Sequence, residues 1–96
     1  MNREKVTIYV SDKSQTCKKV IDQLKSWDIP FQLKNITQEP GYRKELQRKG
    51  IYSTPATFID GIEKGILGFQ KRKMQVALEV QKLKRRGEIS FLLGNQ

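Results

Sequence analysis

The chain contains a single cysteine, Cys17, at a position that favours thiol chemistry. Residues 6–10, Val-Thr-Ile-Tyr-Val, are β-branched and aromatic, as in a buried strand. A polar turn follows, and apolar residues then recur at helical spacing, so Cys17 lies in the first turn of a predicted helix. The unpaired N–H groups and the macrodipole of a helix start favour an anion, and therefore thiolate over thiol. Nearby lysines would act in the same direction.

Length and composition limit the chemistry that is possible. With 96 residues the chain can form one small domain with a modest core and no disulfide staples. It has no histidine, which excludes Ser–His and Cys–His nucleophile pairs and, with one cysteine, an ordinary zinc site. No apolar run approaches the roughly 20 residues of a membrane span, and the start of the chain has no signal-peptide character. We therefore expect a cytoplasmic domain in which any chemistry depends on Cys17.

The net charge of +9 is high for so short a chain. It is compatible with binding to nucleic acid, to an anionic membrane surface or to an acidic protein. Solvated, lysine-rich helix faces would give the same charge without any partner. Because neither an aromatic RNA-binding signature nor a DNA-binding helix pair is recognisable, specific nucleic-acid binding is not expected.

The hydrophobic pattern predicts the element order β-α-β-α-β-β-α. Ser14 is a good N-cap residue, and Gly50 would end the second helix in the C′ position. Asp60-Gly61 between two apolar runs is a hairpin signal. The helix between the first two strands indicates a βαβ unit with parallel strands. The predicted strands are residues 4–10, 31–36, 56–59 and 62–67, and the predicted helices are residues 14–27, 41–49 and 71–85. Apolar residues such as Leu33 alternate with polar ones in residues 31–36, which predicts a strand with one buried face.

Three stretches carry a family resemblance. Ser14-Gln15-Thr16-Cys17 at a helix start resembles the active site of glutaredoxins and related thioredoxin-fold redoxins, which have Cys-x-x-Cys there. Ser53-Thr54-Pro55 resembles the cis-proline loop of that fold, which faces the cysteine pair. Leu67-Gly68-Phe69-Gln70 is similar to the glycine turn before the last helix, in the form found in glutaredoxin-like donors of ribonucleotide reductase.

The resemblance implies an α/β, thioredoxin-like fold of the glutaredoxin type, with a four-stranded mixed sheet flanked by helices. It places this domain over residues 1–86 and leaves residues 87–96, with their apolar centre, as a C-terminal extension that packs on the domain or on a partner. Cys17 takes the place of the second, resolving cysteine, and Ser14 that of the first, attacking one. The implied substrate-binding residues are Tyr9, Lys13, Gln15, Thr16, Ser53, Thr54, Pro55, Gly68 and Phe69.

The implied partners are a thiol or disulfide substrate, either a protein or a small molecule, and a reductase or an acidic protein. No resident cofactor is implied. Two features that bind glutathione in many glutaredoxins are changed, since Ser11 stands where a basic residue is common and the turn at Gly68 lacks a second glycine. The cysteine that holds an iron–sulfur cluster in some single-thiol glutaredoxins is also replaced.

Ser14 changes the expected mechanism. The family's reaction begins when the first thiolate attacks a disulfide, and the second thiol then resolves the mixed disulfide. A serine hydroxyl does not provide this nucleophile at neutral pH without a base, so the two-cysteine cycle is not available. Three interpretations remain: a redox protein in which Cys17 forms mixed disulfides, a binding module in which Cys17 is a small buried hydrophobe, and an engineered Cys-to-Ser variant of a dithiol glutaredoxin.

Overall fold

The computed structural model describes residues 6–62 and 64–86. Residues 4–5 of the predicted first strand, position 63 of the predicted hairpin and the predicted extension 87–96 lie outside these residues. All other predicted elements fall inside them.

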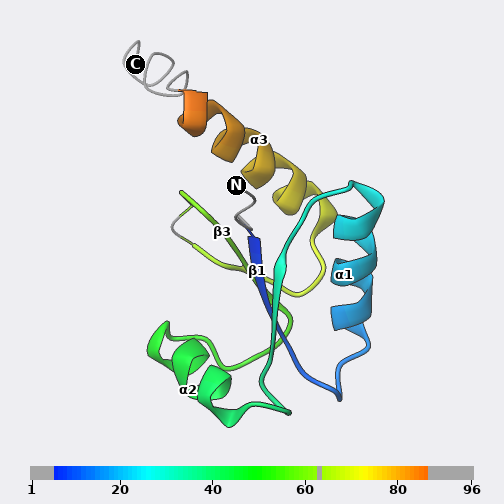
Figure 1. Ribbon diagram of the computed structural model, residues 1–96, viewed down its shortest axis with the longest axis vertical. Helices are drawn as coiled ribbons and strands as arrows, with labels where there is room; N and C mark the ends of the chain where they lie inside the picture. Colours follow the sequence, from blue (N-terminus) through cyan, green and yellow to red (C-terminus); the bar gives the residue numbers. More distant parts are fainter. Residues whose placement is uncertain (1–5, 63, 87–96) are drawn as a thin grey trace.

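One mixed sheet of four strands forms the centre of the fold, in the order β2-β1-β3-β4 (Figure 1). β1 pairs in parallel with β2 and antiparallel with β3, and β3 pairs antiparallel with β4. The predicted element order, the parallel βαβ unit and the hairpin are therefore confirmed. The strands are β1 (Val6–Val10), β2 (Gln32–Asn35), β3 (Ala56–Ile59) and β4 (Ile66–Leu67), and the helices are α1 (Thr16–Ser26), α2 (Pro40–Arg48) and α3 (Lys71–Arg86).

The helices cover both faces of the sheet (Figure 1). On one face, α1 and α3 bury a core that includes Ile8, Leu24 and Met74, and Cys17 belongs to this cluster. On the opposite face, α2 buries a smaller cluster of Tyr9, Leu46 and Ala56. This division follows from the alternation of side chains along a strand, since Ile8 and Tyr9 are neighbours in sequence and point to opposite faces.

The first helix begins later than the sequence predicts. α1 starts at Thr16, Gln15 occupies the N-cap position, and no side chain caps the helix. The prediction that Ser14 is the N-cap is therefore wrong. The physical reason is a turn before the helix, in which the Ser14 amide donates to the Ser11 carbonyl at 3.5 Å and leaves Ser14 outside the helix.

Two strands also differ from the prediction. β2 does not bury one full face, because it lies at the sheet edge, and Leu33 is 46% exposed. The return strand of the hairpin is short and covers only Ile66–Leu67. The turns agree with the prediction, since Gly50 and Gly61 have φ values of 82° and 86°, in the left-handed region that favours glycine.

Gly65 provides a test of packing between β3 and β4. A Cβ atom at Gly65 would lie 2.7 Å from Cε1 of Phe58, whereas a Cβ atom at Gly41 in α2 would have no neighbour within 4 Å. Gly65→Ala should lower the free energy of unfolding by about 1–3 kcal/mol, because the ring must move. Gly41→Ala is the matched control and should leave stability unchanged or raise it by up to ~1 kcal/mol. Equal unfolding free energies for the two variants in urea would contradict this packing.

Candidate functional site

Three loops meet at one end of the sheet. The strand register places Tyr9, Ala56 and Leu67 in one row across β1, β3 and β4. Just beyond this row, the Gly68 amide donates a hydrogen bond of 2.8 Å to the Pro55 carbonyl oxygen. The glycine turn is therefore fixed against the loop that contains Pro55.

A second contact joins the Pro55 loop to the segment that leads to Cys17. The hydroxyl oxygens of Ser11 and Thr54 lie 2.9 Å apart, within hydrogen-bond distance. Ser11 directly follows β1 and precedes the turn into α1. The Pro55 loop thus contacts both the glycine turn and the residue that precedes the turn into Ser14–Cys17, although about forty residues separate Ser11 from Thr54.

The loop before β3 has an unusual backbone. The peptide bond between Thr54 and Pro55 is cis. Pro55 is buried and Thr54 is half-buried, while Ser53 is exposed. Proline has no N–H, so its burial leaves no donor unsatisfied. Thr54 therefore keeps part of its surface accessible while its hydroxyl contacts that of Ser11.

The glycine turn is held from both sides. Gly68 has a φ of 71°, a conformation that L side chains rarely adopt. The side-chain amide of Gln70 donates to the Leu67 carbonyl oxygen at 2.6 Å and closes the turn. Phe69, between them, is 37% exposed.

The two predicted catalytic positions have different environments. Cys17 is 4% exposed and packs in the core between the sheet and the helices α1 and α3. Ser14 is half-buried in the preceding turn. The thiol is therefore the more covered of the two groups. Of the flanking residues, Lys13 and Gln15 are exposed and Thr16 is half-buried.

Tyr9 is not brought to this site. Its side chain is 2% exposed and belongs to the cluster under α2, on the face of the sheet opposite Cys17. Its hydroxyl donates a hydrogen bond to Glu45, and its ring contacts Phe58 edge to face at a centroid distance of 5.5 Å. We therefore assign Tyr9 to the packing of α2 rather than to substrate binding.

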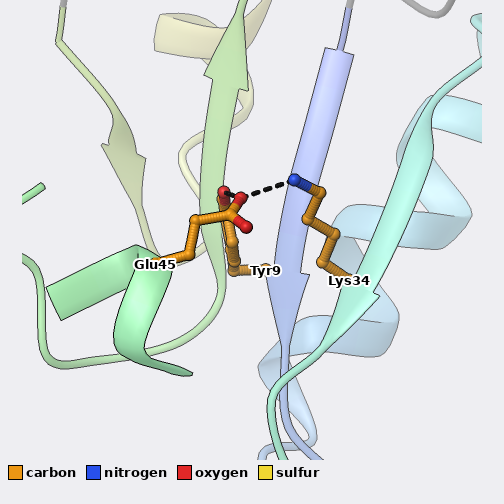
Figure 2. A network of polar contacts seen from close by, with 3 residues as sticks. All are labelled: Tyr9, Lys34 and Glu45. Atoms are coloured by element: carbon orange, nitrogen blue, oxygen red, sulfur yellow. Dashed lines mark hydrogen bonds and ion pairs between the residues drawn. The ribbon is translucent and has the colours of Figure 1, made fainter. Parts of the chain in front are cut away.

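Sequence reasoning missed the polar network around Tyr9 (Figure 2). Glu45 on α2 accepts hydrogen bonds from Tyr9 on β1 and from Lys34 on β2, the latter at 2.5 Å. The Lys34 ammonium also lies 5.4 Å from the ring centroids of both Tyr9 and Tyr42. The parallel register, which pairs Tyr9 with Lys34, is the signal that could have revealed half of this network.

Burial and hydrogen bonds in the network shift the pKa values of Tyr9 and Glu45 in opposite directions. Burial, followed by the hydrogen bond to Glu45, raises the pKa of Tyr9. The hydrogen bonds from Lys34 and Tyr9 lower the pKa of Glu45. At neutral pH the tyrosine is therefore protonated and the carboxylate is charged, which is the state that holds α2 against the sheet.

Comparisons with known proteins agree with this geometry. The family model described as Glutaredoxin matches residues 6–62. The crystal structure of the thioredoxin-like protein BC3987 is 28% identical, with a TM-score of 0.67, and the match covers 74% of this chain and 96% of that one. A glutaredoxin from Methanosarcina mazei Go1 is 26% identical, with a TM-score of 0.64 and 77% of each chain covered. No curated protein sequence matches significantly.

A more distant structure supports the fold alone. The glutaredoxin (grx-1) from Archaeoglobus fulgidus is 21% identical, with a TM-score of 0.64, and the match covers 77% of this chain and 85% of that one.

The mixed sheet, its helices and the three joined loops define a thioredoxin-like redox protein. Because the family model covers more than half of the sequence, the chain belongs to the glutaredoxin family. Among the described helices, none is long and apolar enough to cross a membrane.

Glu45→Gln tests the network under α2. The lowered pKa means that the ionised carboxylate stabilises the fold above its ordinary value of 4.5 and that this stabilisation is lost as pH falls through the lower folded value. We expect Glu45→Gln to cost about 1 kcal/mol at pH 7, a discounted figure because solvent screens a carboxylate that is 37% exposed.

Urea unfolding at neutral and acid pH measures both effects. The loss of stability on acidification should be smaller in Glu45→Gln than in the unchanged protein. Glu79→Gln, on the exposed surface of α3, is the control and should keep the original pH dependence. Identical pH profiles for Glu45→Gln and the unchanged protein would refute a stabilising role for the network.

Proposed function

We propose that this protein is a thiol–disulfide redox protein that reacts through Cys17 alone at an altered glutaredoxin-type site. The observation that carries the proposal is the joining of the Ser11, Thr54 and Gly68 segments by hydrogen bonds of 2.9 and 2.8 Å around the start of the helix with the only thiol. These contacts would be expected of a substrate site, and family membership supports thiol–disulfide chemistry.

The proposed reaction is a single thiol–disulfide exchange. The Cys17 thiolate attacks one sulfur of a disulfide, a new S–S bond forms to Cys17, and the substrate bond breaks. The other half of the substrate leaves as a thiolate. A low-molecular-weight thiol, as its thiolate, then attacks the substrate sulfur of the mixed disulfide, so that Cys17 is released as a thiolate and the thiol and substrate become joined.

Ser14 limits this chemistry to one cysteine. Its hydroxyl can donate a hydrogen bond to a neighbouring sulfur, but it cannot form the disulfide that completes the family's cycle. We further propose that the substrate sulfur lies against Thr54 and Pro55. The turn at Gly68 would line one side of the bound substrate, and Lys13, Gln15, Thr16, Ser53 and Phe69 would lie around it.

The burial of Cys17 sets the expected rate. Because Cys17 is 4% exposed, a disulfide can reach its thiol only when the side chains around it move aside. Exchange should therefore be slow compared with that of a two-cysteine relative. A cytoplasmic setting suits the proposal, since low-molecular-weight thiols are kept reduced there. The substrate would be a protein disulfide or a small disulfide.

The same burial favours a second candidate function. If the Cys17 thiol remains covered, the joined loops would bind a partner without a covalent step, and Cys17 would act only as a core residue. The two functions differ in one observable, which is the reaction of Cys17 in the folded protein.

Mass spectrometry after incubation with oxidised glutathione distinguishes the two functions. For the redox function, the native protein should gain one glutathione on Cys17, and a reduced thiol should remove it. Cys17→Ala is the control and should gain none. Modification that appears only in denaturant would reject the redox function and leave the binding function.

A further inference from the structure

The loop after β2 is bonded to the turn that leads from β1 into α1. The side-chain amide of Asn35, the last residue of β2, donates a hydrogen bond of 2.8 Å to the Asp12 carboxylate. In the opposite direction, the backbone amide of Asp12 donates to the Thr37 hydroxyl at 3.1 Å. Two hydrogen bonds from another part of the chain therefore hold Asp12, and neither involves the Pro55 loop or the glycine turn.

Asn35 is itself fixed in place. Its side-chain oxygen accepts hydrogen bonds from the backbone amides of Thr37 and Gln38, at 2.8 and 3.1 Å. Its position is paired with Val10 in the parallel register of β1 and β2. The side chain thus uses its oxygen on its own loop and its amide group on Asp12. An aspartate could accept the same two bonds, but at neutral pH it could not donate to Asp12.

The start of α1 has few contacts of its own to hold it. No side chain caps this helix. In the preceding turn, the Ser14 amide donates to the Ser11 carbonyl oxygen at 3.5 Å, which is long for such a bond. The turn is therefore held mainly from outside, by the contact of Ser11 with the Pro55 loop and by the two hydrogen bonds of Asp12.

We propose that Asn35 is a positioning residue that holds the start of α1 and thereby keeps Cys17 covered. Cys17 is the second residue of α1 and is 4% exposed, so its thiol becomes accessible only when the surrounding structure opens. By holding Asp12 in the preceding turn, Asn35 opposes this opening. The proposal rests on the proposed function and describes how access to the same site is regulated.

Local opening explains how a contact near the surface can change the reactivity of a buried thiol. A buried group reacts in proportion to the population of molecules in which it is exposed, and that population depends on the free energy of local opening. A single hydrogen bond contributes modestly to stability, so its loss should raise the open population severalfold. The rest of the fold would remain intact.

Exchanging the side chains of Asp12 and Asn35 tests the contact between them. Asn35→Asp keeps the acceptor for the loop amides but places two carboxylates against each other, so Cys17 should react about three- to tenfold faster. The double variant Asp12→Asn with Asn35→Asp again pairs an amide with a carboxylate, and its rate should return to within about twofold of the unchanged protein. Asp12→Asn alone leaves two amides that can pair, and it should have little effect.

Thr37 provides a second, independent pair of variants. Thr37→Val removes the hydroxyl that accepts the Asp12 amide and keeps the branched shape, so Cys17 should react faster. Thr37→Ser keeps the hydroxyl and should react at the rate of the unchanged protein.

The rate is measured on the native protein with dithiodipyridine, a small chromogenic disulfide. The Cys17 thiolate forms an S–S bond with one half of the reagent, and the other half leaves as thiopyridone, whose absorbance is followed. Rates at increasing urea concentration separate local opening from global unfolding, because local opening exposes little surface and depends weakly on urea. Gly65→Ala, which should destabilise the fold from the β3–β4 side, is the control and should leave the rate without urea unchanged.

Hydrogen exchange of the Lys18 amide gives a readout that needs no thiol chemistry. This amide donates to the Gln15 carbonyl oxygen at 3.1 Å, across the start of α1. It should exchange faster in Asn35→Asp and regain its protection in the double variant.

Three results would overturn the role of Asn35. These are equal rates in Asn35→Asp and the unchanged protein, a faster rate that the double variant does not reverse, and an increase that follows urea as global unfolding does. Reversible changes in Lys18 exchange, without modification of native Cys17 in any variant, would reject the redox function and support the role of Asn35 at the start of α1. Modification of native Cys17 at one rate in all variants would support the redox function and reject the role of Asn35.

Discussion

The burial of β1 on both faces is the constraint on which the rest of the structure depends. Val6 and Ile8 are fully buried, Tyr9 is 2% exposed and Val10 is 4% exposed. The strand has β2 on one side and β3 on the other, so its backbone is paired along both edges. A shift of one residue in its register would exchange the two cores, because Ile8 and Tyr9 face opposite helices. The position of β1 therefore fixes where Ser11 and the start of α1 lie.

Much of the fold could be predicted because its elements are locally encoded. The β-branched run of β1, the helical spacing of Val20 and Leu24 and the Asp60-Gly61 turn each carry their own signal. The exposure of the edge strand β2 and the first residue of α1 were predicted less well. Leu33 looked like a core residue, but a strand with one neighbour and little cover leaves it exposed. The start of α1 depended on a turn at Ser11 that residue preferences do not encode.

The candidate site was predictable as three stretches but not as contacts. Their resemblance to glutaredoxin motifs pointed to Ser14, Cys17, Thr54 and Gly68 without showing which atoms would join them. The hydrogen bond between Ser11 and Thr54 is a tertiary contact between residues 43 positions apart, and no local pattern encodes it. The network of Tyr9, Lys34 and Glu45 was missed for the same reason. Tyr9, placed at the site by its position in sequence, belongs to that network on the opposite face.

The structure shows the loops and the thiol of the candidate site in different states of exposure. The loops at Thr54 and Gly68 are joined by hydrogen bonds to Ser11 and Pro55, respectively. The one thiol, Cys17, is buried, and Ser14 is half-buried in the turn before α1. In the function that we propose, the side chain at position 14 is what removes the two-cysteine cycle.

Replacing that hydroxyl by a thiol tests this account most directly. Ser14→Cys should form an intramolecular disulfide with Cys17 under mild oxidation, and in its reduced form it should reduce a disulfide substrate faster than the unchanged protein. Mass spectrometry and thiol titration would measure the bond, and a substrate reduction assay would measure the rate. Two free thiols after oxidation, with no gain in reduction rate, would contradict the claim that the side chain at position 14 alone removes the two-cysteine cycle.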